Sequence, residues 1–370
     1  MERVVLCVDN YDPDNAAAAL AADKLLNLSA IIVNGRFAHP DPNAHLADKD
    51  DAFSESEHLS CTRRMAGLIA RSGSTTPVFK GLIAKASIIP HDMFWPDAVF
   101  DVRNDNKNQQ PFAGDMDDAI SFLEKSDGTM HVIGAGPMTE VAALMDSQAI
   151  YNKLGTITMQ FGVFSWGGKK AVQTASGRKV QFNYGCDIEA GNKVLDKWPG
   201  ELYVVPTDIT KQPDVAIPDL ETLMRMPINT ELKEVYAVAH PQITARTGGR
   251  IYIHDLHPTF LMADLLRRSD WYPNCKDAED NRLWYVGNYL VEKIGHNALR
   301  PTTDPARAGE LELIRHTKGK SAEIDDSKHR IVIGTSHRAD IQKALSQTEP
   351  SFDRGYPSSF FETTIAALRS

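Results

Sequence analysis

The sequence predicts an α/β fold in which a mainly parallel, doubly wound sheet is flanked by helices, and three observations support it. Short apolar runs typical of buried strands alternate with helix-length segments through the first half of the chain, which indicates βαβ units. Polar residues follow several of these runs directly, as at the carboxyl ends of parallel strands. No repeat and no linker rich in Pro, Gly or Ser interrupts the 370 residues, so we expect one domain over 1–370.

Each expected element rests on a local pattern. The first strand, at 4–9, contains five consecutive apolar residues and ends in an acidic turn. Similar runs predict further strands at 29–33, 76–80, 129–134, 156–161, 201–206 and 330–334. Helices are expected at 16–28, which is rich in alanine, and at 61–71, 115–125, 139–145, 220–226, 232–238, 257–268 and 338–345. The polar segments 36–58 and 94–112 are longer than ordinary loops, which is typical of active-site walls or lids.

Composition narrows the possible partners. The net charge of −9 and the pI near 5.7 argue against a nucleic-acid partner. No apolar run approaches the ~18 residues that would cross a bilayer. The four cysteines (Cys7, Cys61, Cys186 and Cys275) show no CxxC spacing and no signal peptide precedes them, so we expect reduced thiols in a cytoplasmic protein.

Oxygen-bearing side chains crowd the end of the first strand. Asp9, Asp12, Asp14 and Asn15 stand in or just after it, where ligands bind in open α/β sheets. Such oxygen donors suit a hard cation such as Ca²⁺ or Mg²⁺. The alternative is that the residues from Asp12 to Asn15 only cap the following helix, because Asp and Asn are common N-caps.

Three later segments have a similar character. Gly134 and Gly136 lie in a turn after a strand, where they allow a ligand to approach the backbone, although a plain βα turn has the same pattern. Gln181 and Asn183 alternate with aromatic residues, so in an extended segment their amides would point to one side and could bracket vicinal hydroxyls. A polar edge strand is the alternative.

The third of these segments contains a His–Asp pair before an apolar helix. Asp255 suits a metal ligand or an N-cap, and His254 suits a general acid or a buried structural histidine.

Together these segments resemble the inosine–uridine-type nucleoside hydrolases, the nucleoside N-ribohydrolase family. That family opens with a strand and an Asp-x-Asp-x-x-x-Asp-Asp cluster, which 9–15 matches loosely. Its Thr-Gly-Pro-Leu-Thr-Asn turn is matched by 135–140, its Glu-Phe-Asn segment by 181–183, and the Asp-Pro-Glu-Ala that follows by 187–190. Its Val-Pro-Leu-Asp-Val-Thr segment is similar to 205–210, and its His-Asp pair to 254–255. The motifs keep the family's order and span nearly the whole chain.

The resemblance implies a hydrolase that cleaves the N-glycosidic bond of a ribonucleoside or related N-riboside with a water bound to a divalent cation. It implies catalytic roles for Asp9 as base and His254 beside the departing base. Ca²⁺ or another divalent cation would be bound by Asp9, Asp14, Asn15, the carbonyl of Ala135 and Asp255. The substrate would contact Asp14, Asn183, Gln181, Asn34 and Met159. It further implies purine and pyrimidine salvage in the cytoplasm and a homodimer or homotetramer.

The alignment of the opening cluster leaves alternatives. Without gaps, Asn10, Asp14 and Asn15 fall on the family's three principal carboxylates, and with a small gap Asp9 and Asp14, or Asp12, supply the charge. We favour Asp9, because cation affinity rises with the number of carboxylates and Asp9 ends the strand.

The departures from the family pattern suggest two other functions. Gln181 replaces a Glu of the family, and the stretch 163–179 contains added cationic residues. Together they could accept a riboside with an anionic 5′-substituent. The alternative is that the cationic residues only keep this stretch soluble. Amides at carboxylate positions suggest a repurposed, ribosyl-binding protein with impaired catalysis. A dinucleotide-binding enzyme ranks well below both, because no GxGxxG follows the first strand.

Overall fold

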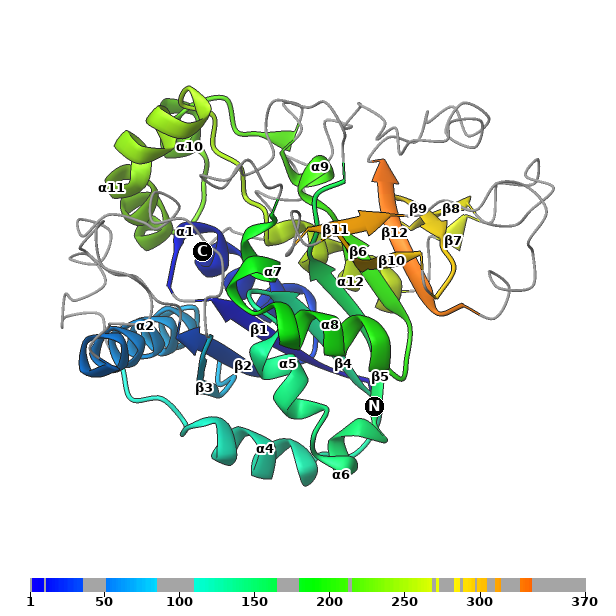
Figure 1. Cartoon of the computed structure of the whole chain (residues 1–370). Coiled ribbons are helices and arrows are strands. Elements are labelled where there is room, and N and C mark those ends of the chain that lie inside the picture. The colour runs from blue at the N-terminus through cyan, green and yellow to red at the C-terminus, as the bar shows by residue number, and fades with distance from the viewer. Residues whose placement is uncertain are drawn as a thin grey trace.

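A ten-stranded sheet runs through the part of the chain that the structure describes, in the order β3-β2-β1-β4-β5-β6-β12-β9-β8-β7 (Figure 1). The computed structural model describes residues 2–9, 11–35, 51–84, 110–164, 180–211, 215–267, 271–272, 283–286, 289–296, 298–304, 310–313 and 327–334. The expected helix at 338–345 and most of the polar segment 94–112 lie outside these residues.

Most of the sheet is parallel, as the sequence predicted. The parallel strands are β1 (Arg3–Asp9), β2 (Leu28–Gly35), β3 (Val78–Ile83), β4 (Met130–Ala135), β5 (Leu154–Gln160), β6 (Leu202–Val205) and β12 (His329–Gly334). Three antiparallel strands extend it beyond β12, namely β9 (Tyr289–Lys293), β8 (Leu283–Val286) and β7 (Trp271–Tyr272). A separate antiparallel pair joins β10 (Leu299–Pro301) to β11 (Leu311–Leu313). These short antiparallel strands were not predicted, because each is too short to show a clear period.

The helices of the described residues are α1 (Pro13–Leu25), α2 (Asp51–Arg71), α4 (Met116–Glu124), α5 (Thr139–Leu144), α6 (Gln148–Tyr151), α7 (Phe182–Cys186), α8 (Ile188–Lys197), α9 (Thr207–Thr210), α10 (Leu220–Arg225), α11 (Thr230–Thr247) and α12 (Leu256–Arg267). Helix α11 is longer than the expected helix at 232–238, and α8 was not expected. Two further helices correct expectations about the polar segment 36–58 and the segment around Gln181. Helix α2 begins ten residues before the expected start at 61, since its buried apolar residues at helical spacing, such as Cys61, Met65 and Leu68, mark only its second half. Residues 182–186 form a short helix rather than an extended segment, because the Gln181 side chain caps it by accepting from the Tyr184 N–H.

Helices cover both faces of the sheet (Figure 1). On β1, Val4, Leu6 and Val8 face the core shared with α1, α2, α11 and α12, while Val5 and Cys7 face the core shared with α4, α5 and α8. This alternation follows from the two-residue period of a strand. The sheet is therefore doubly wound, as predicted.

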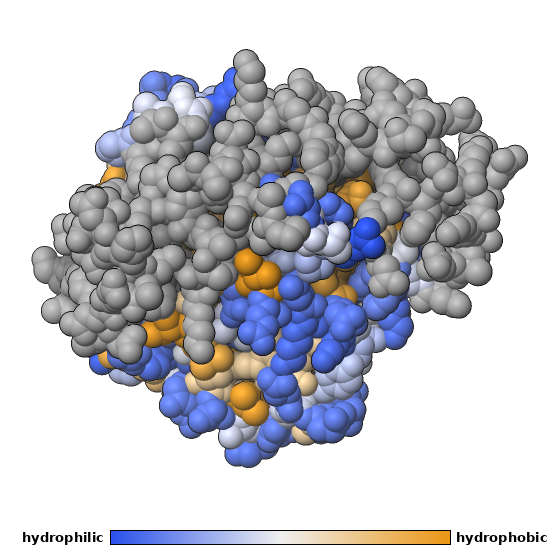
Figure 2. All heavy atoms as spheres, viewed as in Figure 1, coloured by the Kyte–Doolittle hydropathy of each residue, from blue (hydrophilic) through white to orange (hydrophobic). Residues whose placement is uncertain are grey.

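The described surface is mainly polar. Figure 2 shows hydrophilic residues across much of the described part of the face in view. Among the described residues, the exposed large apolar side chains are those of Leu82, Phe122 and Met224. Within that same part of the chain, every helix is too short or too polar to span a bilayer.

The carboxyl ends of the parallel strands meet at one edge of the sheet. Asp9 at the end of β1 is paired with Asn34 near the end of β2, and Val8 is paired with Ala135 at the end of β4. The turn after β4 lies directly against β1, since a Cβ atom on Gly136 would lie 2.5 Å from the Asp9 nitrogen. Glycine at 136 therefore brings the 135–140 turn against the end of β1.

Candidate functional site

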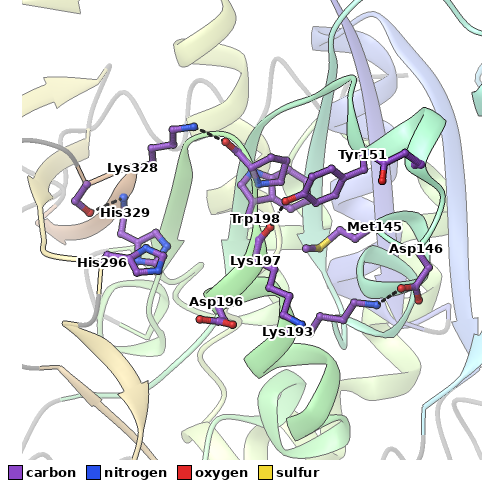
Figure 3. A pocket seen from close by; sticks show the side chains of 13 residues that line it. Met145, Asp146, Tyr151, Lys193, Asp196, Lys197, Trp198, His296, Lys328 and His329 are labelled. Carbon is purple, nitrogen blue, oxygen red and sulfur yellow. Dashed lines mark hydrogen bonds and ion pairs between the residues drawn. The ribbon is translucent and has the colours of Figure 1, made fainter.

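A cavity of about 690 Å³ lies at the amino-terminal edge of the sheet, near the starts of β5, β6 and β12 (Figure 3). Its walls include Trp198 and the stacked rings of His296 and His329. Two of its lysines are already engaged, as Lys193 pairs with Asp146 and Lys328 donates to a backbone carbonyl. Ligands of open α/β sheets bind at the opposite, carboxyl-terminal edge. The candidate site therefore lies elsewhere.

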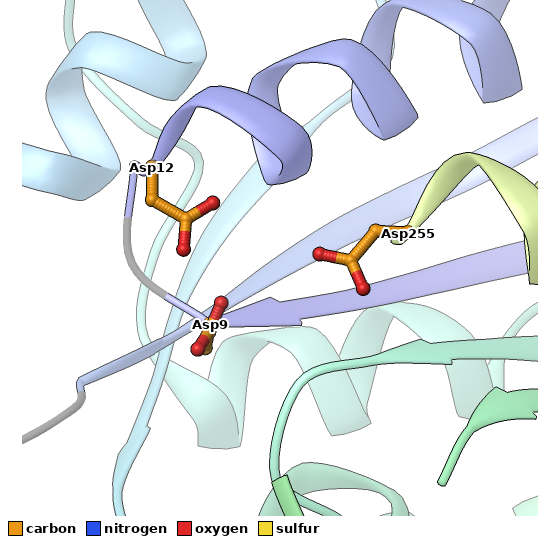
Figure 4. A group of neighbouring side chains, drawn as sticks. All are labelled: Asp9, Asp12 and Asp255. Carbon is orange, nitrogen blue, oxygen red and sulfur yellow. The ribbon is translucent and has the colours of Figure 1, made fainter. Parts of the chain in front are cut away.

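Three buried carboxylates converge at the carboxyl-terminal edge. Asp9, Asp12 and Asp255 each place an oxygen within 4.8 Å of the others (Figure 4). They are only 3–4% exposed. Carboxylates at this separation repel one another strongly when water is excluded, so the cluster favours a bound cation.

The fold brings these residues together from three elements. Asp9 ends β1, Asp12 precedes α1, and Asp255 immediately precedes α12, which packs against α1 and β4. Asp12 is also the N-cap of α1, because its side chain accepts from the Asn15 N–H. Capping and cluster formation, which the sequence presented as alternatives, thus occur together at Asp12.

The Asn15 side chain connects two of the carboxylates. Its Nδ2 donates to Oδ1 of Asp9 and, at 2.7 Å, to Oδ1 of Asp12. Its own Oδ1 is buried and has no hydrogen-bond partner. An amide therefore lies inside the carboxylate cluster, where the resemblance had placed a metal ligand.

Asp14 and Tyr236 complete the acidic surroundings. Burial, together with the carboxylates of Asp12, Asp255 and Asp9, raises the pKa of Asp14 well above its usual value. Burial, followed by the carboxylates of Asp14, Asp12 and Asp255, raises the pKa of Tyr236, whose buried hydroxyl has no hydrogen-bond partner. Tyr236 was not predicted as a site residue, because a tyrosine within a helix resembles any core residue in sequence.

His254 lies just before Asp255 and contacts Thr210. Its Nδ1 is 2.6 Å from the Thr210 hydroxyl, and its ring stacks on Tyr252. Burial, with the positive charge of Lys211 and the neighbouring His257, lowers the pKa of His254 well below its usual value. The imidazole is therefore neutral near pH 7.

Asn34 is held at the end of β2 by a buried glutamate. Its Nδ2 donates to Glu140 Oε1 at 2.6 Å, and the Leu82 N–H donates to the same oxygen at 2.9 Å. Burial is the main cause that raises the pKa of Glu140 to about 8. Asn34 Oδ1 and Glu140 Oε2 have no hydrogen-bond partner. Glu140 therefore holds the Asn34 amide in an orientation that leaves Asn34 Oδ1 able to accept a hydrogen bond.

The other expected substrate residues lie at the end of β5. Gln181 Nε2 and Asn183 Nδ2 both donate to Gln160 Oε1, at 2.6 and 3.0 Å, and Gln160 donates to Thr207. Met159 is fully buried in the hydrophobic core. Gln160, which links the two amides, was not singled out from the sequence, because its partners are 21 and 23 residues away in the chain.

The described residues fit a hard divalent cation. Asp9, Asp12 and Asp255 supply charged oxygens, the unpartnered Asn15 Oδ1 supplies a neutral one, and the Ala135 carbonyl ends the neighbouring strand β4. All are oxygen donors, as Ca²⁺ and Mg²⁺ prefer. Within the described residues Asp12 joins Asp9 and Asp255 in this cluster, and Asp14 stands beside Asp12.

Some sequence predictions fall outside the described residues. They concern Asn10 and the cationic residues of the 163–179 stretch, namely Lys169, Lys170, Arg178 and Lys179.

Comparison with known proteins identifies the fold. No protein-family model matches this sequence, and no curated protein sequence matches it. The structure is similar to an inosine–uridine preferring nucleoside hydrolase from Bacillus anthracis, with a TM-score of 0.61. The two sequences are 14% identical, and the match covers 100% of this chain and 99% of the other. A plant nucleoside hydrolase gives 16% identity, 100% and 99% coverage and a TM-score of 0.62. A purine-preferring ribonucleoside hydrolase from Gardnerella vaginalis gives 13% identity, 99% coverage of both chains and a TM-score of 0.60.

Proposed function

Because the chain has the nucleoside hydrolase fold, we propose that it hydrolyses the N-glycosidic bond of a ribonucleoside or related N-riboside with the help of a divalent cation. The observation that supports this most is the convergence of Asp9, Asp12 and Asp255 at the carboxyl-terminal edge of the sheet. In this proposal the whole chain forms one domain that acts in salvage in the cytoplasm as a homodimer or homotetramer.

The proposed cation, Ca²⁺ or another divalent ion, would be held by Asp9, Asp12, Asp255, the Asn15 amide and the Ala135 carbonyl, with Asp14 beside them. When bound, such an ion lowers the pKa of a coordinated water and orients sugar hydroxyls. Burial of these carboxylates strengthens both effects, because water does not screen their charges.

Asp9 is the proposed base. Its carboxylate ends β1 inside the cluster, where it would take the proton of the attacking water. The water oxygen bonds to the anomeric carbon, the C–N bond breaks with its electron pair on the base nitrogen, and the water proton passes to Asp9. The carboxylates also stabilise the positive charge that develops on the ribose.

The remaining residues have proposed binding roles. Asp14 and the Asn34 oxygen accept hydrogen bonds from ribose hydroxyls, and Asn183 and Gln181 lie on the β5 side of the sugar. Met159, which is buried next to Gln160 in β5, supports that side from the core. His254 donates a hydrogen bond to the departing base through Nε2, because its Nδ1 is engaged with Thr210. A neutral imidazole can fill this role at pH 7, because its Nε2–H donates a hydrogen bond without the ring having to be protonated.

The test is a hydrolysis assay with inosine, adenosine, uridine and cytidine, in Ca²⁺ and in a chelator, with release of free base as the measurement. Asp9→Ala and Asp255→Asn should each lower the rate about 10³-fold or more, as expected for loss of a base or of charge stabilisation. Asp196→Asn, which alters an exposed carboxylate near the opposite edge, is the matched control and should retain full activity. Release of no base from any nucleoside, or equal rates in the Asp9→Ala protein, would exclude the proposed chemistry.

A repurposed ribosyl-binding protein is the second candidate, and the position of the Asn15 amide between two carboxylates favours it. Calorimetry separates the two. Nucleoside binding that persists without base release, and without cation binding at micromolar concentrations, would favour the binding protein. A hydrolase that accepts a 5′-modified riboside would instead release base only from nucleosides with an anionic 5′-group.

A further inference from the structure

The amide of Asn15 lies where two carboxylates of the cluster would otherwise face each other. Its Nδ2 donates to one oxygen of Asp9 and one of Asp12, and its backbone N–H also donates to Asp12, at 3.0 Å. The residue is 1% exposed. The Asn15 N–H groups therefore form a bridge that partly compensates the repulsion between Asp9 and Asp12.

The other end of the same amide is unsatisfied. Asn15 Oδ1 is buried without a hydrogen-bond partner, although a buried amide oxygen normally has one. A cation bound between Asp9 and Asp12 would compete with the Nδ2 bridge for the same oxygens. Rotation of the amide about its Cβ–Cγ bond would exchange its nitrogen for its oxygen, which would turn the bridge into a neutral ligand.

We infer that Asn15 sets the cation affinity of this site: its amide takes the place of a cation between Asp9 and Asp12, and it turns to present Oδ1 when a divalent ion binds. The inference rests on the proposed function only in taking a divalent cation as the ligand, and it does not depend on hydrolysis. Two consequences follow. The protein folds without the cation, and it binds the cation less tightly than it would with a carboxylate at position 15, since affinity for Ca²⁺ rises with ligand charge.

The experiment measures Ca²⁺ binding and thermal unfolding of the full chain, without nucleoside. Asn15→Asp should bind Ca²⁺ at least about tenfold more tightly by calorimetry, because a carboxylate replaces a neutral ligand and the competing bridge is lost. In chelator the same variant should melt below the wild type, because a further carboxylate joins Asp9 and Asp12. Its gain in melting temperature on adding Ca²⁺ should exceed that of the wild type.

Asn152→Asp is the matched control. It adds the same charge at an exposed position and keeps an oxygen that accepts from Gln148. Its Ca²⁺ affinity and melting temperatures should equal those of the wild type. Equal Ca²⁺ affinity in the Asn15→Asp and wild-type proteins, or equal Ca²⁺-induced gains in melting temperature, would overturn the inference.

Asn15→Ala tests the bridge if the aspartate variant does not fold. It should melt below the wild type in chelator, and the difference should shrink as Ca²⁺ is added, because the cation then holds Asp9 and Asp12 together. An unchanged melting temperature in chelator would show that the amide does not stabilise the cluster. Neither result depends on base release, so failure of this inference leaves the proposed hydrolysis standing, and the reverse also holds.

Discussion

Two polar clusters lie at the same edge of the sheet and differ in how well they are satisfied. The acidic cluster surrounds the ends of β1 and β2 and comprises Asp9, Asp12, Asn15, Asp255, Asn34, Glu140 and Tyr236. The amide cluster, at the end of β5, comprises Gln160, Gln181, Asn183 and Thr207. Both are buried.

Unpaired polar atoms distinguish the two. In the acidic cluster Asn15 Oδ1, Asn34 Oδ1, Glu140 Oε2 and the Tyr236 hydroxyl are buried without a partner, whereas the described atoms of the amide cluster include none of this kind. Each such atom costs about 1–3 kcal/mol of folding free energy. A protein that retains four of them in one place has a region arranged for a ligand, whereas the side chains of the amide cluster satisfy one another.

The largest stability effect that we expect in the acidic cluster comes from Glu140→Gln. The pKa of Glu140 is about 8 in the folded protein, against an ordinary value of 4.5. Between these two pH values Glu140 is protonated in the folded protein and ionised in the unfolded chain. The folded state binds more protons, so stability falls as pH rises through this window, by about 1.4 kcal/mol per pH unit, and levels off above pH 8. Glutamine does not ionise and still accepts from Asn34 and Leu82, so the variant should be more stable than the wild type by up to about 3 kcal/mol at pH 7.

Denaturant unfolding at pH 5, 7 and 8.5 measures this difference. The gain should be small at pH 5 and largest at pH 8.5. Glu124→Gln, which changes an exposed glutamate that accepts from Ser147, should show no such trend. A gain for Glu140→Gln that does not change with pH would contradict the assignment of a proton to Glu140.

In the amide cluster the expected effect has the opposite sign. Gln160→Met keeps the length of the side chain and removes the oxygen that accepts from Gln181 and Asn183. Two buried donors then lose a partner, so we expect a loss of about 2 kcal/mol or more in the free energy of unfolding. Urea unfolding measures it, with Gln148→Met at the exposed start of α6 as the control near zero. A loss no greater than that of the control would show that the amides pair elsewhere.

Much of the fold could be predicted from the sequence. The first strand, its acidic turn and the alternation of strands and helices predicted a doubly wound parallel sheet, because period and turn chemistry are local properties. The antiparallel strands β7, β8 and β9 were missed, since strands of two to five residues show no reliable period. The first half of α2 was assigned to a loop, because its polar residues hide the helical pattern.

The site could be predicted only in part. Asp9 and Asp255 were placed together by the resemblance of ordered motifs and the topology of strand ends, and the structure brings them together. The choice between Asp12 and Asp14 depends on a turn of a few residues, which spacing does not determine. Contacts such as Asn34 with Glu140, 106 residues apart, depend on tertiary packing and leave no local pattern.

The smallest expected effect on stability compares the two clusters most directly, because the same change, tyrosine to phenylalanine, is made beside each of them. Tyr236 in the acidic cluster has a buried hydroxyl without a partner, whereas Tyr184, next to the amide cluster, donates to Asn192 at 2.8 Å. Removing an unpaired buried hydroxyl relieves a desolvation cost, while removing a paired one leaves an acceptor behind. Tyr236→Phe should therefore be neutral or stabilising by up to about 1 kcal/mol, and Tyr184→Phe should destabilise by about 1 kcal/mol. Urea unfolding of both variants measures the difference, and equal losses would mean that the Tyr236 hydroxyl is as well satisfied as that of Tyr184.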